Sequence, residues 1–148
     1  MNIENTIQSD CAPLGEIVQK LMDNNIEIHC LRDVTRVGLG TVLNELADAS
    51  KCAITIYEDK LPIDPQVKSF CKILGLNPLH MGNEGKLTVA VPKEQEQKAL
   101  EIIKCCKYGK NAAIIGSVSE GSGVAMKTAI GGKHAVSELF GEGLPRIC

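Results

Sequence analysis

The last residue of the chain, Cys148, carries a thiol that could act as a nucleophile or carry a transferred group. Residues 141–147, which lead to it, contain two glycines that let the backbone swing and a proline that favours an extended end. A segment over residues 138–148 could span up to about 33 Å at roughly 3.3 Å per residue. We therefore expect a flexible tail that carries the Cys148 thiol between sites. The alternative is a frayed terminus with an incidental cysteine.

A second group that could do chemistry is Met81-Gly82-Asn83-Glu84-Gly85-Lys86, directly before an expected strand. Its two glycines bracket an amide, a carboxylate and an amine. The carboxylate of Glu84 could accept a proton from a bound substrate, as a general base does. Turn chemistry alone favours the simpler alternative, a surface turn with a solvated glutamate.

The third candidate is the loop at residues 32–40, which lies between an expected strand and an expected helix and contains two glycines and two arginines. The Thr35 hydroxyl could cap the helix, the Arg36 guanidinium could bind an anion, and the glycines permit close backbone approach. These features predict a phosphate-facing loop. The alternative is an internal Arg32–Asp33 or Asp33–Arg36 pair that only fixes the loop, because short glycine loops are weak signals.

The seven cysteines and three histidines predict no metal site. The sequence has no Cys-x-x-Cys motif, its histidines are scattered singly, and adjacent Cys105 and Cys106 would point to different sides of a helix. Every cysteine before Cys148 lies in an apolar or amphipathic segment, where a free thiol behaves as a small hydrophobe. The odd count and irregular spacing favour a reducing cytoplasm.

Composition indicates one globular domain and excludes several partners. The chain has 148 residues, of which 44% are hydrophobic and 23% charged, enough to bury a core. The net charge of −2 and the 3% aromatic content give neither the field nor the stacking surface that nucleic acid requires. No apolar run approaches the roughly 20 residues of a membrane span, and the start does not read as a signal peptide.

Helical and extended patterns alternate along the chain, and these elements must position the three candidates. Helices are expected from Pro13 to the Asn24-Asn25 pair and over residues 39–49, 64–75 and 94–104. Strands are expected over residues 26–31, 52–57, 87–91, 112–118 and 124–129, the last two across a turn at residues 120–123, with residues 133–136 extending the second. Ser9 or Asp10 is expected to cap the first helix, and Leu74 to face the core. The pattern predicts an α+β domain with helices packed on a mixed sheet.

Six blocks of the sequence form a further pattern: residues 9–14, 31–39, 43–45, 83–87, 112–116 and the terminal Pro-Arg-Ile-Cys. Together these blocks resemble the C-terminal domain of the HypE family of hydrogenase maturation proteins, within the AIR-synthase-related, PurM-like superfamily. That ending separates HypE from its relatives. The resemblance implies a domain over residues 9–137, between an extension at 1–8 and the tail at 138–148. It also implies a PurM C-terminal-domain-like fold, partly like the ferredoxin fold.

The resemblance implies a function for the terminal thiol. Cys148 would accept a carbamoyl group from a HypF-like carbamoyltransferase, ATP would phosphorylate the carboxamide oxygen, and Glu84 would take a proton from the amide nitrogen. Loss of phosphate would leave a thiocyanate on Cys148. The cyano group would then pass to iron on the HypC–HypD complex, as a ligand of the [NiFe]-hydrogenase centre.

The resemblance also implies that this chain corresponds to one of two fused domains. ATP with Mg would be bound mainly by an N-terminal ATP domain that is absent here, so we expect no intrinsic cofactor and an inactive isolated domain. The candidate ligand contacts on this chain are Arg32, Asp33, Thr35, Arg36, Gly38, Asn83 and Lys86. The alternatives are a non-catalytic docking and carrier module, or a fragment of another enzyme of the AIR-synthase superfamily.

Overall fold

The computed structural model describes residues 8–36 and 38–138, which form four α-helices, three short 3-10 helices and six strands. The α-helices are α1 (Gly15–Asp23), α2 (Gly38–Ser50), α3 (Pro65–Leu74) and α4 (Glu96–Lys104). The 3-10 helices are η1 (Glu58–Lys60), η2 (Pro78–His80) and η3 (Lys93–Gln95). The strands are β1 (Cys30–Asp33), β2 (Cys52–Tyr57), β3 (Leu87–Ala90), β4 (Gly116–Glu120), β5 (Val124–Lys127) and β6 (Lys133–Ala135).

The strands form two sheets. β1 and β3 make an antiparallel pair, and the other four strands lie in the order β4-β2-β5-β6. Within the larger sheet β2 is antiparallel to β4 but parallel to β5, and β6 is antiparallel to β5. The predicted fold class, α+β with a mixed sheet and packed helices, is therefore confirmed.

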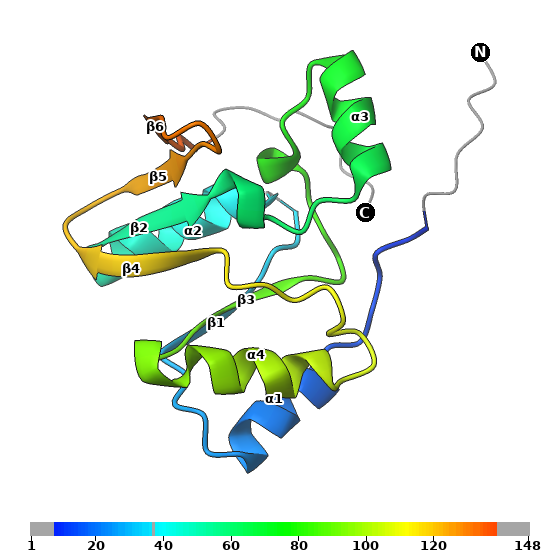
Figure 1. Ribbon diagram of the computed structural model, residues 1–148, viewed down its shortest axis with the longest axis vertical. Helices are drawn as coiled ribbons and strands as arrows, with labels where there is room; N and C mark the ends of the chain where they lie inside the picture. The colour runs from blue at the N-terminus through cyan, green and yellow to red at the C-terminus, as the bar shows by residue number, and fades with distance from the viewer. Residues whose placement is uncertain (1–7, 37, 139–148) are drawn as a thin grey trace.

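Two clusters of buried side chains hold the fold together. In the first, Leu43 and Ala47 of α2 pack on Ile54 and Ile56 of β2. The second cluster lies between α1 and α4 and consists of Ile17, Leu21, Ile26, Ala99 and Cys106. Figure 1 shows the corresponding arrangement: α1 and α4 lie together at the bottom, the β1–β3 pair crosses the middle, and the larger sheet with α2 forms the upper part. Burial of apolar surface of this kind is the main driving force for folding.

Helix α3 begins and ends where the sequence predicts. The Asp64 carboxylate accepts hydrogen bonds from the backbone N–H groups of Gln66 (2.7 Å) and Val67 (3.4 Å), and Gly75 ends the helix in the left-handed conformation at φ 69°. The prediction that Leu74 faces the core is wrong, because its side chain is 64% exposed. The helix lies at the edge of the molecule (Figure 1), and Cys71 is its one buried residue.

Several predicted strands differ from the observed ones; the strand expected over residues 112–118, for example, lies at Gly116–Glu120. The strand expected over residues 26–31 starts later, at Cys30, because the buried side chain of Ile26 belongs to the α1–α4 cluster. The hairpin expected across residues 120–123 does not form, because β2 lies between β4 and β5 and pairs with both. Residues 133–135 do not extend β5 either; they turn back as the antiparallel strand β6.

Candidate functional site

The pairing of β1 with β3 brings two of the sequence candidates together. Asp33 lies opposite Leu87 at the end of the strand pair, and the backbone contacts continue beyond it. The N–H of Val34 donates to the carbonyl of Lys86 (3.1 Å), and the carbonyl of Val34 accepts from the N–H of Asn83 (3.1 Å). The basic loop after β1 therefore lies directly beside the loop that carries Glu84.

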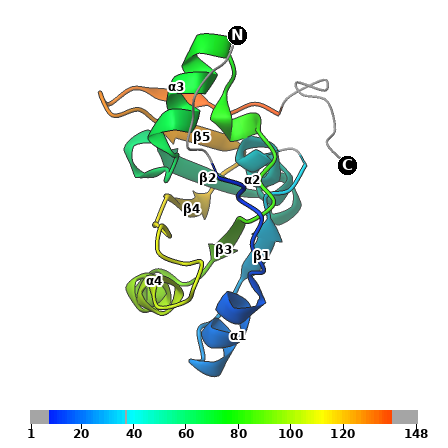
Figure 2. The ribbon, with the colours of Figure 1, turned by 90° about the vertical axis from the view of Figure 1, so that its right-hand side faces the viewer.

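Two glycines permit these backbones to approach closely. A Cβ atom at Gly82 would lie 3.2 Å from the backbone N and O of Arg36, and one at Gly85 would overlap the carbonyl oxygen of Asp10. The backbone of Asp10, in the segment before α1, therefore lies directly against Gly85. Figure 2 shows this dark-blue segment passing beside the green chain that leads into β3.

Asp10 contacts the backbone of the Glu84 loop. The N–H of Glu84 donates to Asp10 Oδ2 (3.1 Å), and Lys86 Nζ lies 4.0 Å from the same oxygen. Lys86 Nζ also donates to Asn83 Oδ1 (2.6 Å). The prediction that Ser9 or Asp10 caps α1 is therefore wrong: the N-cap is Leu14, with no side-chain capping bond, and the Ser9 hydroxyl accepts from the N–H of Cys11.

The Glu84 carboxylate is available for chemistry. The residue is exposed, and within the described ranges no hydrogen bond or ion pair engages its carboxylate oxygens. Its backbone is held by Asp10 while its side chain points to no described partner. A carboxylate in this condition can accept a proton from a molecule that binds beside it.

Within its described residues, the loop after β1 contains neither of the internal pairs that were the alternative to a ligand site. Instead, Arg32 forms an ion pair with Glu45 of α2 (Nη2–Oε2, 3.0 Å). Asp33 accepts a hydrogen bond from the Thr35 hydroxyl (2.8 Å). Arg36 has a positive φ of 67° and an exposed side chain, with no ion-pair partner in the described part of the chain. Its guanidinium is the cation best placed to meet an anion beside the Glu84 loop.

The glycines at the start of α2 meet the protein itself. A Cβ atom at Gly38 would lie 2.6 Å from the carbonyl oxygen of Leu79, and one at Gly40 would lie 2.7 Å from Cε1 of His80. The Nδ1 atom of His80 is buried and has no hydrogen-bond partner in the described structure, and burial lowers the pKa of this histidine. Sequence reasoning missed His80, because a single histidine in a turn gives no signal of burial. A ligand contact by Gly38 stays a prediction.

Cys148 lies outside the described residues, so the carrier thiol has no structural account. The six described cysteines are free, and two of them, Cys71 and Cys106, are buried. Burial raises the pKa of the Cys106 thiol, which suits a core residue rather than a nucleophile. Cys11 and Cys105 are exposed, so the expectation that all six act as small hydrophobes is wrong for these two.

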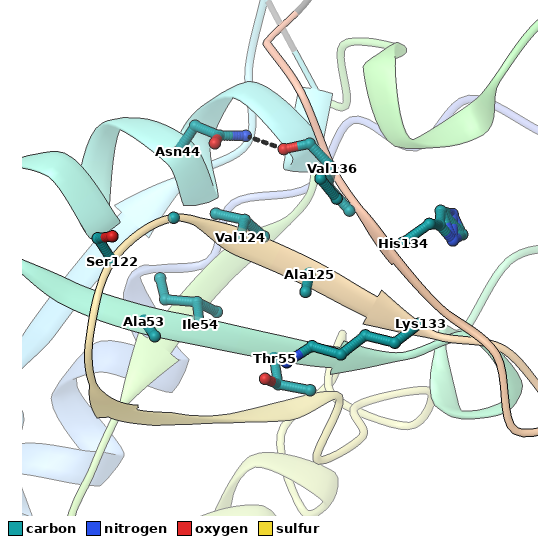
Figure 3. A pocket seen from close by; sticks show the side chains of 12 residues that line it. Asn44, Ala53, Ile54, Thr55, Ser122, Val124, Ala125, Lys133, His134 and Val136 are labelled. Atoms are coloured by element: carbon teal, nitrogen blue, oxygen red, sulfur yellow. Dashed lines mark hydrogen bonds between the residues drawn. The ribbon is translucent and has the colours of Figure 1, made fainter.

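A hollow of about 450 Å³ lies elsewhere, on the larger sheet, and contains none of the predicted site residues. Its floor includes Ile54, Thr55 and Ala125, and Lys133 extends over the strands toward Thr55 (Figure 3). At the rim of this hollow, the Asn44 side chain donates to the carbonyl of Val136 (2.9 Å).

Among the described residues there is no cluster of three metal-ligating side chains. In the same ranges, no helix is both long and apolar enough to cross a membrane.

The fold and the site together define the class of protein: it is an α+β domain in which the loop that carries Glu84 lies beside a basic loop. Residues 9–128 match the family described as AIR synthase related protein, C-terminal domain, and the chain belongs to that family. Within it, the chain is 43% identical over 148 residues to a hydrogenase expression/formation protein of Methanocaldococcus jannaschii. It is likewise 43% identical, over 144 residues, to carbamoyl dehydratase HypE of Rhodobacter capsulatus. These alignments cover 99% and 96% of the chain.

Solved HypE structures share the fold. One crystal structure of the hydrogenase maturation protein HypE superposes with a TM-score of 0.92 at 41% identity, covering the whole of this chain and 49% of that one. A HypE–HypF complex (TM-score 0.89, 42% identity) covers 94% of this chain and 46% of its match. A HypE–ATP complex (TM-score 0.90, 37% identity) covers 97% and 45%. The resemblance to HypE is therefore confirmed. The chain spans less than half the length of the curated relatives that it matches: 44% of the Methanocaldococcus jannaschii protein and 42% of the Rhodobacter capsulatus one.

Proposed function

We propose that this chain acts in [NiFe]-hydrogenase maturation, as the part of a HypE-like carbamoyl dehydratase that holds the carrier thiol and the base. The observation that carries the proposal is sequence similarity over essentially the whole chain to a protein named carbamoyl dehydratase. The site geometry adds support, because an exposed, unpaired carboxylate lies beside a basic loop. The division into a domain at residues 9–137 and a carrier tail at residues 138–148 belongs to the same proposal.

The proposed reaction has two steps at Cys148. First, its thiol loses a proton and attacks the carbonyl carbon of an activated carbamoyl group, so that a thiocarbamate forms as the activating group leaves. Second, the carboxamide oxygen takes the γ-phosphoryl group of ATP and departs as phosphate, while both N–H protons are removed. The products are a thiocyanate on Cys148, ADP and phosphate. The cyano group then passes to iron, which is here a substrate.

We assign the proton transfer to Glu84 and anion contacts to the basic residues beside it. Glu84 takes a proton from the amide nitrogen, which a carboxylate can do when it has no competing partner. The exposed guanidinium of Arg36 suits a phosphate, and the Lys86 ammonium lies in the same loop pair. ATP with Mg is held mainly by an N-terminal ATP domain in this proposal, with Arg32, Asp33, Thr35, Gly38 and Asn83 as the further contacts. Of these, Arg32 is already paired with Glu45.

The proposed partners follow from the same assignment. A HypF-like carbamoyltransferase supplies the carbamoyl group, and a HypE–HypF complex among the solved structures of similar fold supports this choice. The HypC–HypD complex receives the cyano group. The solved HypE–ATP complex of similar fold supports the use of ATP.

Intact-mass measurement in the presence of the carbamoyltransferase and the ATP domain tests the proposal. Cys148→Ala should abolish carbamoyl acceptance, whereas the matched controls Cys11→Ala and Cys105→Ala, at exposed cysteines, should not. Glu84→Gln should accept the carbamoyl group but stall before loss of one water, because an amide cannot take the proton. Carbamoylation of Cys148→Ala would refute the carrier assignment, and normal dehydration by Glu84→Gln would refute the base.

A further inference from the structure

The Asp10 carboxylate is the one described side chain that the structure shows bonded to the backbone of Glu84. The two residues are 74 positions apart in the sequence, yet Asp10 Oδ2 accepts the Glu84 N–H at 3.1 Å. Gly85 makes this approach possible, since any side chain there would overlap the Asp10 carbonyl oxygen. Lys86 Nζ lies 4.0 Å from the same carboxylate oxygen and also donates to Asn83 Oδ1. Asp10 therefore contacts Glu84 and Lys86 directly and is linked to Asn83 through Lys86.

We propose that Asp10 is a positioning residue that fixes the backbone of Glu84 so that its carboxylate meets the amide nitrogen of the carrier-bound substrate. This inference rests on the proposed function, because it assigns Asp10 a role through the base Glu84. Hydrogen bonds to an ionised acceptor are shorter and stronger than neutral ones, so a carboxylate is well suited to hold one N–H group. Without it, the backbone between Gly82 and Gly85 keeps the wide conformational freedom that glycines allow.

The contact is suited to positioning more than to stability. Asp10 is 41% exposed and Lys86 is 47% exposed, and ion pairs at such exposure add little to stability. Catalysis is far more sensitive, because a displacement of about 1 Å of a reacting group can reduce a rate by about 100-fold. Removal of the Asp10 carboxylate should therefore slow the base-dependent step while leaving the unfolding midpoint nearly unchanged.

Two variants separate the hydrogen bond from the rest of the side chain. Asp10→Ala removes the acceptor, whereas Asp10→Asn keeps an acceptor oxygen for the Glu84 N–H. In the assay with carbamoyltransferase and ATP domain, Asp10→Ala should dehydrate about 10- to 100-fold more slowly, with carbamoylation of Cys148 unchanged. Asp10→Asn should stay within about threefold of the parent rate. Ser9→Ala is the matched control, because the one hydrogen bond of the Ser9 hydroxyl within the described residues is local, from the N–H of Cys11.

A second readout does not depend on activity. In this chain alone, amide hydrogen exchange at Glu84 should be slow in the parent and in Asp10→Asn, and faster in Asp10→Ala. Equal exchange in all three would show that the contact is not formed and would overturn the inference whatever the enzyme does.

The outcomes for Glu84→Gln distinguish the two proposals. If Glu84→Gln stalls while Asp10→Ala dehydrates normally, the positioning role fails and the proposed function stands. If Glu84→Gln dehydrates normally, the base assignment fails and the positioning role fails with it. The double variant, Asp10→Ala with Glu84→Gln, should dehydrate no more slowly than Glu84→Gln alone, because Asp10 acts only through the Glu84 carboxylate. A further loss in the double variant, or equal slowing of both steps with a lowered unfolding midpoint, would also overturn the inference.

Discussion

At the scale of single residues, Gly85 controls whether the segment before α1 can reach the Glu84 loop. We predict that Gly85→Ala destabilises the protein by about 1–3 kcal/mol, since the new methyl group overlaps the Asp10 carbonyl oxygen and backbone must move. Urea denaturation would measure the change. The matched control is Gly15→Ala at the start of α1, where a Cβ atom meets nothing within 4 Å and should cause no loss. Equal midpoints for Gly85→Ala and the parent would contradict the close approach.

His80 makes stability depend on pH in a defined direction. Its pKa is lowered in the folded state from the ordinary value of 6.5, so the unfolded chain binds more protons and stability falls as pH drops below about 6.5. His80→Leu removes both the titration and the unpartnered Nδ1 atom. We predict that the unfolding midpoint of this variant changes less between pH 7 and pH 5 than that of the parent. An equal change of the midpoint in His80→Leu and in the parent would contradict this prediction.

The types of the candidate residues could be read from the sequence, but several of their contacts could not. Glu84 and the basic loop were identified from their motifs, and β1–β3 pairing explains why they lie together. Asp10 was misassigned as a helix cap, because an aspartate shortly before a proline and an apolar stripe is a typical N-terminus signal. Its actual partner is 74 residues away, and no local pattern encodes that distance.

At the scale of elements, α3 offers the clearest test of whether local capping residues determine where a helix forms. Asp64→Ala should destabilise the helix by about 1 kcal/mol, because two backbone N–H groups lose their acceptor. Since Cys71 is the only buried residue of α3, the loss should appear as faster amide exchange within α3 before it affects the whole protein. Asp64→Asn keeps an acceptor oxygen and is the matched control. Unchanged exchange in α3 of Asp64→Ala would show that tertiary contacts alone fix this helix.

Elements bounded by strong local signals were predicted well. The strand over residues 52–57 matches β2, and Asp64, Pro65 and Gly75 set the limits of α3 as expected. The arrangement of β4 and β5 was not predictable in this way. A turn with two glycines between extended segments favours a hairpin, but the insertion of β2 between them depends on pairing with residues at least 60 positions earlier.

At the scale of the whole molecule, the two buried clusters share no residue, so their contributions should be separable. Leu21 is fully buried in one cluster and Ile56 is 1% exposed in the other. Each of Leu21→Ala and Ile56→Ala should cost about 2–5 kcal/mol, through lost burial and the cavity left behind. The losses should add in the double variant, because distant sites without shared partners act independently. Urea denaturation measures all three, and a clear departure from additivity would indicate coupling through the β1–β3 pair.

The central position of β2 also has a consequence for the order in which the protein can form during synthesis. β2 emerges early, yet both of its neighbours in the sheet, β4 and β5, are made only after residue 115. Until then, the apolar side chains of Ile54 and Ile56 have no neighbouring strand on which to pack. Pairings between distant segments close slowly, because a long loop must be ordered before contacts compensate for it. We therefore expect the larger sheet to assemble only after most of the chain has been released, with β2 exposed to unproductive association in the meantime.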